Sequence, residues 1–295
     1  MISSIRVTRD YPVSIADNDE WALGACRGDA DNVNWDMLFS QISRDCLVVD
    51  VGAHLGTFAV RAAALGAIVI AIEAGSSNVE HLRRTARLNP DLRLDVIHGA
   101  AWSESGKVRF REDRAYGMIS REGGEEVEAV TVDDVVGLYD PRAIRNPDVF
   151  IKIDVEGSEP QVLRGMKRLL GANSNPPVVF YESNSHTLAL QGSDIREPRR
   201  ILAESGYVSF LIHEGLLYRL GPEDSQPTVY TDVIALRRES DMGDIAGMPL
   251  ALFQSAMLAG PTRLPIPDEG KAHVRRELLR RPDLASPELL HLIGE

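Results

Sequence analysis

The sequence contains only two cysteines, Cys26 and Cys46, which is too few for a disulfide framework or a cysteine-based metal site. We expect Cys46, at the start of an apolar stretch, to be a buried small hydrophobic residue. No apolar run approaches the length of a membrane span, and the first residues lack the basic and then apolar plan of a signal peptide. The expected protein is therefore cytoplasmic and has no membrane partner.

Positive charge is also scarce. The chain has 32 Lys and Arg against 44 Asp and Glu, which gives a formal net charge of −12. A protein that holds nucleic acid by its phosphates needs a basic surface, so this balance disfavours DNA and RNA as partners. Internal repeats and low-complexity tracts are absent as well, and a hydrophobic content of 44% in 295 residues is typical of a globular protein with a sizeable core.

The most informative motif is a glycine-containing loop between an apolar segment and a helical pattern. Residues 47–56 read LVVDVGAHLG, in which Asp50 precedes Gly52 and Gly56. Glycines let the backbone approach a ligand closely, and the following helix offers unpaired N–H groups in its first turn. A second acid, Glu73, ends the next apolar run at about the 20-residue offset at which a carboxylate binds ribose hydroxyls. The pattern predicts a nucleotide-binding cradle.

The residues around these glycines favour one class of nucleotide cofactor. Dinucleotide-binding loops have the pattern G-x-G-x-x-G, which places a pyrophosphate on the helix end. Here His54 stands between the two glycines, and the Asp50 carboxylate would repel a pyrophosphate but attract a sulfonium and an amino group. The loop therefore predicts S-adenosylmethionine as the cofactor, with an NAD-linked oxidoreductase as the first alternative.

Strand-like and helix-like segments alternate along the middle of the chain, which predicts an α/β fold with a doubly wound, mostly parallel sheet and an antiparallel end. The expected strands cover residues 46–51, 67–72, 92–98, 107–110, 127–132, 149–153, 177–181, 207–213, 216–220 and 228–236, and the expected helices cover 56–65, 76–88, 160–170 and 197–205. Around this domain of residues 45–239 we expect an N-terminal cap over 1–44 and a helical C-terminal extension over 240–295. The extension is interpreted as a substrate lid, an arm for homo-oligomer formation or a packed appendage.

Polar side chains follow two of the expected strands at their carboxyl ends, where open α/β sheets bind ligands. Asp154 and Glu156 come directly after one strand, and Glu182 and His186 come after the next. Consecutive carboxylates at the mouth of a buried strand are costly to desolvate without a ligand, a metal or a basic partner. We therefore expect a functional role for these carboxylates, whereas Lys152 better fits an ion pair that fastens the same turn.

Several motifs in this order resemble the FkbM-type methyltransferases. They are VDVGAHLG at 49–56, IEA at 72–74, VTVDD at 130–134, IKIDVEGSE at 151–159 and VLRG at 162–165. The combination is specific, whereas each motif alone is weak. The resemblance implies a class I S-adenosylmethionine-dependent fold and methylation of a hydroxyl on a sugar, polyketide, peptide or other metabolite. His54 stands where the family usually has asparagine, and the C-terminal extension is not covered.

The resemblance also implies which residues bind the cofactor. Asp50 and the backbone of the glycine loop would hold the amino acid end, Glu73 would bind the ribose, and the turn over 99–103 would lie along the adenine. Within that turn Trp102 is a candidate for stacking on the adenine. A tryptophan that packs in the hydrophobic core is an equally good interpretation. The predicted cofactor-binding residues are Asp50, Gly52, Ala53, His54, Gly56, Thr57, Glu73, Asn78, Ala101, Trp102 and Ser103.

Methyl transfer is an in-line displacement in which the acceptor oxygen must be aligned with the S–CH₃ bond, and such positioning can contribute ~7–11 kcal/mol. A hydroxyl acceptor also benefits from a base, typically by about 10²–10⁴-fold. The predicted catalytic candidates are Asp154, Glu156, Glu182 and His186, and the product would be S-adenosylhomocysteine. No spacing in the sequence establishes a metal site. Carboxylate oxygens such as those of Asp154 are ligands that hard divalent cations accept, so metal binding stays open as an alternative. N-methylation and a binding protein without turnover also stay open.

Overall fold

The computed structural model describes residues 3–8, 11–16, 42–138, 148–172, 176–213, 216–226 and 229–237, together with positions 19, 22, 26, 35, 38 and 39. The predicted C-terminal extension over 240–295 lies outside these residues, as do most positions of the predicted cap between 17 and 41. Among the helices that the structure describes, none has the length and apolarity needed to cross a bilayer.

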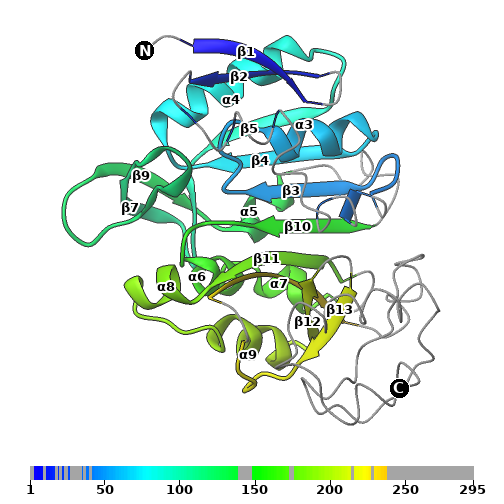
Figure 1. The fold of residues 1–295 in the computed structure, drawn as a ribbon, viewed down its shortest axis with the longest axis vertical. Coiled ribbons are helices and arrows are strands. Elements are labelled where there is room, and N and C mark those ends of the chain that lie inside the picture. Colours follow the sequence, from blue (N-terminus) through cyan, green and yellow to red (C-terminus); the bar gives the residue numbers. More distant parts are fainter. Residues whose placement is uncertain are drawn as a thin grey trace, which may run out of the picture.

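Eight strands of the described part form one mixed sheet through the centre of the molecule (Figure 1). In sheet order they are β5 (Leu94–His98), β4 (Ile68–Glu73), β3 (Leu47–Val51), β10 (Val149–Ile153), β11 (Val178–Asn184), β14 (Tyr230–Leu236), β12 (Val208–His213) and β13 (Leu216–Leu220). The strands from β5 to β11 are parallel, and the pairings of β14, β12 and β13 are antiparallel. The predicted doubly wound, mostly parallel sheet with an antiparallel end is confirmed.

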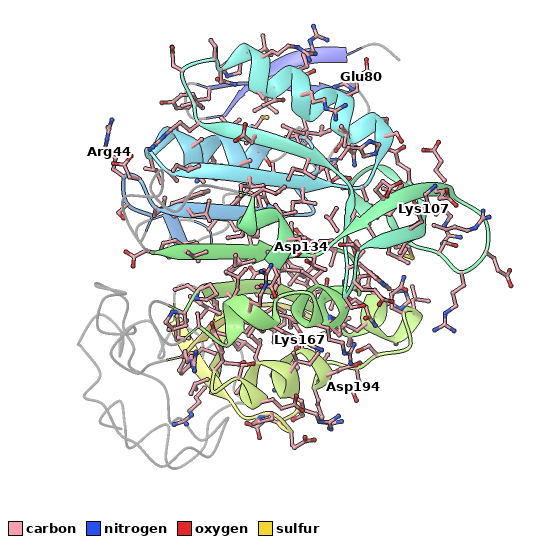
Figure 2. The ribbon with its side chains drawn as sticks, turned by 180° about the vertical axis from the view of Figure 1, so that it is seen from behind. Arg44, Glu80, Lys107, Asp134, Lys167 and Asp194 are labelled. Atoms are coloured by element: carbon pink, nitrogen blue, oxygen red, sulfur yellow. The ribbon has the colours of Figure 1, made fainter. Side chains whose placement is uncertain are left out.

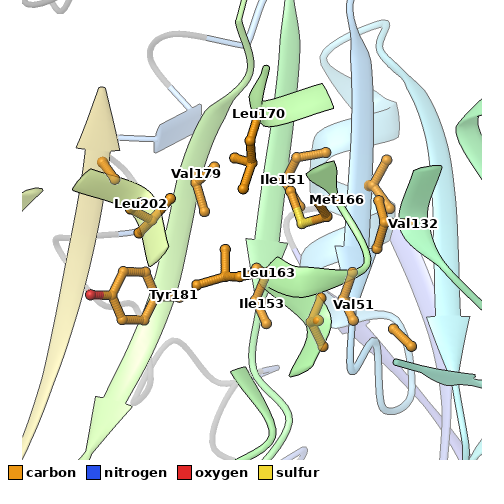
Figure 3. Close-up of a cluster of buried hydrophobic side chains, with 14 of the residues drawn as sticks. Val51, Val132, Ile151, Ile153, Leu163, Met166, Leu170, Val179, Tyr181 and Leu202 are labelled. Carbon is orange, nitrogen blue, oxygen red and sulfur yellow. The ribbon is translucent and has the colours of Figure 1, made fainter. Parts of the chain in front are cut away.

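Helices cover both faces of this sheet. One face carries α5 (Val132–Gly137), α6 (Glu159–Arg164), α7 (Lys167–Leu170) and α9 (Glu197–Glu204), and the other carries α3 (Thr57–Ala64) and α4 (Ser76–Leu88). On the first face, Ile151 and Ile153 of β10 share a core with Leu163 and Met166 (Figure 3). Because both faces of the sheet are covered, the central strands β3, β4 and β10 are apolar along most of their length, which is why their positions could be predicted as apolar runs.

A smaller four-stranded sheet lies at the carboxyl ends of the parallel strands (Figure 1). In order it contains β6 (Ala100–Ala101), β9 (Glu125–Val130), β7 (Gly106–Arg111) and β8 (Met118–Ile119), and the short 3₁₀ turn η1 (Arg114–Tyr116) precedes β8. The strands expected over 107–110 and 127–132 are β7 and β9. The sequence reveals neither β6 nor β8, because strands of two residues are too short to show an alternating pattern.

The N-terminal hairpin packs against α4. Its strands β1 (Ser3–Thr8) and β2 (Tyr11–Ala16) are antiparallel. The backbone N–H of Ser14 donates a hydrogen bond to Thr85 Oγ1 at 3.0 Å, and the Thr85 hydroxyl donates to the Leu55 carbonyl at 3.1 Å. Through Thr85 the hairpin is therefore tied to the loop between β3 and α3.

The helix expected over 160–170 is in fact two helices, α6 and α7, with Gly165 between them. A Cβ atom at Gly165 would overlap the carbonyl oxygen of Trp102. Glycine therefore allows the segment after β6 to pack directly against the main chain at the point where the helix breaks.

We predict that Gly165→Ala lowers the free energy of unfolding by ~1–3 kcal/mol, because the added methyl group must displace the main chain around Trp102. Gly137→Ala is the matched control, since its Cβ would meet only the Arg168 guanidinium at 3.7 Å. The control should be neutral or slightly stabilising. Urea denaturation of both variants measures the difference, and equal losses would contradict the packing account.

Candidate active site

A cavity opens at the carboxyl ends of β3, β4 and β10, the edge at which open α/β sheets bind ligands. Its floor contains Gly52 after β3, Glu73 at the end of β4 and Asp154 after β10. Phe110 and Ile119 of the smaller sheet form part of its wall. The cavity therefore joins the central sheet to the smaller one.

Residues predicted to bind the cofactor come together at this cavity from distant parts of the sequence. Those that line it are Gly52, His54, Glu73, Asn78 and Ala101. They belong to the loop after β3, the end of β4, the first turn of α4, and β6. The structure brings these residues together around one space, and their contact with a cofactor stays a prediction.

Glu73 links the loops after β3 and β4. Its Oε2 accepts a hydrogen bond from the His54 N–H at 2.8 Å, and its Oε1 accepts from the Gly75 N–H at 2.8 Å and from Asn78 Nδ2 at 3.4 Å. Burial raises the pKa of Glu73, and these hydrogen bonds oppose that shift. A carboxylate has about four acceptor positions, so acceptor capacity remains for a ligand hydroxyl in the cavity.

His54 joins the glycine loop to the N-terminal segment. Its Nε2 atom lies 2.9 Å from Asp19 Oδ2, and Asp19 Oδ1 accepts a hydrogen bond from the Ala22 N–H. Both His54 and Asp19 are buried. His54, which stands where the FkbM-type sequences usually have asparagine, thus contacts the N-terminal segment and also lines the cavity.

The two glycines of the loop are required by protein packing. Gly52 has φ 76°, and a Cβ there would overlap the carbonyl oxygen of Asp154. Gly56 has φ 91° and lies so close to Leu82 of α4 that a Cβ would meet its Cδ1 at 2.6 Å. The sequence analysis expected these glycines to let the backbone approach a ligand. In the structure they let the loop approach other parts of the protein, namely Asp154 and Leu82.

Behind the loop, Asp50 of β3 and Lys152 of β10 form a buried ion pair. Lys152 Nζ lies 3.2 Å from Asp50 Oδ1 and 3.3 Å from Asp154 Oδ2. Asp50 is fully buried, and burial raises its pKa to about 6 although Lys152 opposes the shift. Burial would lower the pKa of Lys152, but the two carboxylates outweigh it and raise that pKa. At neutral pH the pair is therefore ionised.

Asp154, Glu156 and Glu182 form an acidic cluster, in which each offers one carboxylate oxygen within 4.8 Å of the others. Burial acts to raise the pKa of Asp154, but Lys152 and a hydrogen bond with Glu182 hold it below its usual value. Burial and the charge of Asp154 raise the pKa of Glu182. Burial also raises the pKa of Glu156 to about 8, and Asp154 and Glu159 act in the same direction. At neutral pH, Asp154 is the carboxyl group of this cluster that stays ionised.

The Methyltransferase FkbM domain matches residues 50–209, which is more than half of the chain. The chain belongs to the FkbM methyltransferase family. The resemblance drawn from the motifs is thereby confirmed.

Individual relatives of this FkbM-family chain are more distant. It is similar to the hexuronic acid methyltransferase AglP of Haloferax volcanii, with 28% identity over 154 residues. That match covers 51% of this chain and 61% of AglP, so it spans less than two thirds of the relative. Similar solved structures include the precorrin-6y C5,15-methyltransferase of Geobacter metallireducens, with a TM-score of 0.40, 13% identity and coverage of 69% of this chain and 86% of the other. The tRNA (uracil-54, C5)-methyltransferase of Pyrococcus abyssi has a TM-score of 0.41, 14% identity and coverage of 79% and 43%.

Several residues predicted to bind the cofactor in this FkbM domain do not line the cavity. They are Asp50, Ala53, Gly56, Thr57, Trp102 and Ser103. Ala53 and Thr57 are buried in the loop and the first turn of α3, and Asp50 is committed to Lys152. Of the turn over 99–103, the residues that face the cavity are Gly99, Ala100 and Ala101.

The predicted catalytic candidates divide in the same way. Asp154 and Glu156 line the cavity, and Glu182 is hydrogen-bonded to Asp154 beside it. His186 lies in the first turn of α8 (Ser185–Leu190), a helix that is not among those expected from the sequence. Its side chain is exposed, and its backbone N–H donates to Asn184 Oδ1 at 3.1 Å, which caps the helix. The structure therefore does not bring His186 to the cavity.

Sequence reasoning missed the part of the wall that comes from the smaller sheet. Phe110 ends the alternating segment of β7, and this alternation was the available signal for an inward-facing aromatic residue. After β7, Glu112 Oε1 accepts hydrogen bonds from the N–H groups of Ser77 at 3.0 Å and Asn78 at 3.3 Å. Glu112 thus caps α4 and fixes the smaller sheet at the mouth of the cavity.

We predict that Lys152→Met lowers the free energy of unfolding by ~3–5 kcal/mol, because it leaves the buried carboxylate of Asp50 without its cation. The double variant Asp50→Asn/Lys152→Met should recover most of this loss, since the uncompensated buried charge is gone. Denaturant unfolding provides the measurement.

The control for this prediction is Lys107→Met on the smaller sheet. Lys107 lies on the periphery of the molecule and forms an exposed ion pair with Glu126 at 2.6 Å (Figure 2). Exposed pairs contribute little to stability, so this variant should unfold much as the unmodified protein does. A double variant as unstable as Lys152→Met alone would show that the ion pair is not the cause.

Proposed function

We propose that this chain is an S-adenosylmethionine-dependent O-methyltransferase that methylates a hydroxyl of a small or medium-sized metabolite. The observation that carries the proposal is the shared cavity. It is lined both by residues predicted to bind the cofactor, Gly52, Glu73 and Asn78, and by the predicted catalytic residues Asp154 and Glu156. Family membership supports methyl transfer, and the name of the relative AglP supports a sugar among the acceptor classes.

The charge of the cavity favours this cofactor over NAD. Its described lining carries the acidic residues Glu73, Asp154 and Glu156 and includes no lysine or arginine. Negative charge attracts a sulfonium and an amino group and repels a pyrophosphate. Glu73 retains acceptor capacity for a ribose hydroxyl, and Ala101, Phe110 and Ile119 offer an apolar wall for a flat base.

In the proposed reaction the acceptor oxygen forms a bond to the methyl carbon while the C–S bond breaks. The bonding electron pair stays on sulfur, which leaves S-adenosylhomocysteine, and the hydroxyl proton passes to a carboxylate. We assign this base role to Asp154, because it lines the cavity and its ion pair with Lys152 favours the ionised form. The binding of both reactants in one cavity supplies the alignment that an in-line displacement needs.

Calorimetric titration of the purified chain tests the choice of cofactor. S-adenosylhomocysteine should bind, and Glu73→Ala should weaken its binding, because the variant loses both the ribose acceptor and the link between the two loops. NAD should not bind. Binding of NAD without binding of S-adenosylhomocysteine would overturn the proposal.

We predict that Asp154→Asn slows methyl transfer to a hydroxyl by about 10²–10⁴-fold while the affinity for S-adenosylhomocysteine, which lacks the sulfonium charge, changes little. Acceptors are found by screening glycosides and other hydroxyl metabolites for a gain in mass of one methylene group. Glu204→Gln, on the exposed end of α9, is the control and should retain the full rate. An unchanged rate in Asp154→Asn would remove Asp154 as the base and favour an amine acceptor, which needs less base assistance.

A further inference from the structure

Glu156 has an unusual environment for a carboxylate. It is only 9% exposed, and no described residue donates a hydrogen bond to its side chain or forms an ion pair with it. The charged groups whose influence it feels are the carboxyls of Asp154 and Glu159. Buried charged groups in proteins are paired or coordinate metals, so Glu156 stays protonated at neutral pH unless a positive partner such as a metal ion lies beside it.

The surroundings of Glu156 add negative charge instead of removing it. In the pairing of β10 with β11, Ile153 lies opposite Tyr181, so Asp154, the next residue, lies beside Glu182 of β11. On its other side, Glu182 lies opposite the buried Asp232 of β14. Like charges at neighbouring positions of a sheet are destabilising. Lys152, the ammonium that the structure shows at this edge, is already shared between Asp50 and Asp154.

The spacing of the acidic cluster fits a single metal ion. Oxygen ligands on opposite sides of a Ca²⁺-sized ion are about 5 Å apart and adjacent ones are about 3 Å apart. One oxygen from each of Asp154, Glu156 and Glu182 lies within 4.8 Å of the other two. The three residues come from the end of β10, the following turn and β11, so the site is created by the parallel pairing of these two strands.

We propose that Asp154, Glu156 and Glu182 bind one divalent cation of the hard, oxygen-preferring class, such as Mg²⁺, Mn²⁺ or Ca²⁺, at the edge of the cavity. The ion supplies the positive charge that Glu156 lacks. Because Asp154 and Glu156 line the cavity, coordination positions on that side are open to water or to oxygens of the acceptor. The ion site rests on these side chains alone, and its role in holding the acceptor rests on the proposed function.

Titration of the full chain with Mn²⁺, after removal of metal by a chelator and dialysis, tests the site. Electron paramagnetic resonance of the free ion should show one bound Mn²⁺ per chain, displaced by excess Mg²⁺ or Ca²⁺. Glu156→Gln and Glu182→Gln should each weaken Mn²⁺ binding by more than about tenfold, and the matched control Glu204→Gln should bind as the unmodified chain does. Absence of binding, or equal binding by Glu156→Gln, would overturn the proposal and indicate at most an adventitious ion.

Thermal unfolding gives a second readout that separates a lost ligand from a lost fold. Mn²⁺ should raise the midpoint of unfolding of the unmodified chain and of Glu204→Gln, and it should leave that of Glu156→Gln unchanged. In metal-free buffer Glu156→Gln should be at least as stable as the unmodified chain, because the neutral amide replaces a carboxyl group that burial keeps protonated at neutral pH. Lower stability of both Glu156→Gln and Glu182→Gln without metal would contradict the charge argument.

Binding of S-adenosylhomocysteine, measured separately on the same samples, distinguishes this proposal from the proposed function. A chain that binds S-adenosylhomocysteine but no Mn²⁺ refutes the ion site and leaves the methyltransferase proposal standing. A chain that binds Mn²⁺ at the acidic cluster but no S-adenosylhomocysteine refutes the proposed function and retains the ion site.

Discussion

The buried ammonium of Lys152 is the constraint on which the rest of the site depends. It lies between Asp50 on β3 and Asp154 after β10, and the parallel register aligns Lys152 directly with Asp50. A charge in this position is tolerated only because it is paired on both sides. The pairing joins the two central strands at their carboxyl ends and holds Asp154 at the floor of the cavity with its positive partner behind it.

Around this floor, the walls of the cavity are held by contacts between segments that are far apart in the sequence. Glu112, after β7, caps α4 beside the cavity, and His54 of the glycine loop bonds to Asp19 of the N-terminal segment. The first contact satisfies backbone N–H groups in the first turn of α4, and the second places the His54 ring beside a buried carboxyl group. The smaller sheet and the N-terminal segment are therefore parts of the site and not appendages to it.

The electrostatic character of the cavity follows from the same arrangement. Lys152 is committed to two carboxylates, and the described lining contains the acidic residues Glu73, Asp154 and Glu156 but no lysine or arginine, so its fixed charge is negative. Such a cavity suits positively charged or hydroxyl-bearing ligands and disfavours phosphates. Glu73 is stabilised by backbone N–H groups, whereas Glu156 has no such donors. For this reason we propose that Glu73 binds a ribose hydroxyl and that Glu156 binds a cation.

By itself the sequence determined the longer alternating strands and helices of the main sheet, the nucleotide-type sheet and the family. β10 at Val149–Ile153 and α4 at Ser76–Leu88 agree with the expected bounds, because apolar runs and helical periodicity are local properties of the chain. Only the tertiary structure decided that Asp50 faces Lys152 and not the cavity, that Phe110 is part of the wall, and that His186 is exposed on a helix. These facts depend on the register between strands and on packing across the sheet, which bring together residues whose separation along the chain carries no record of their contact.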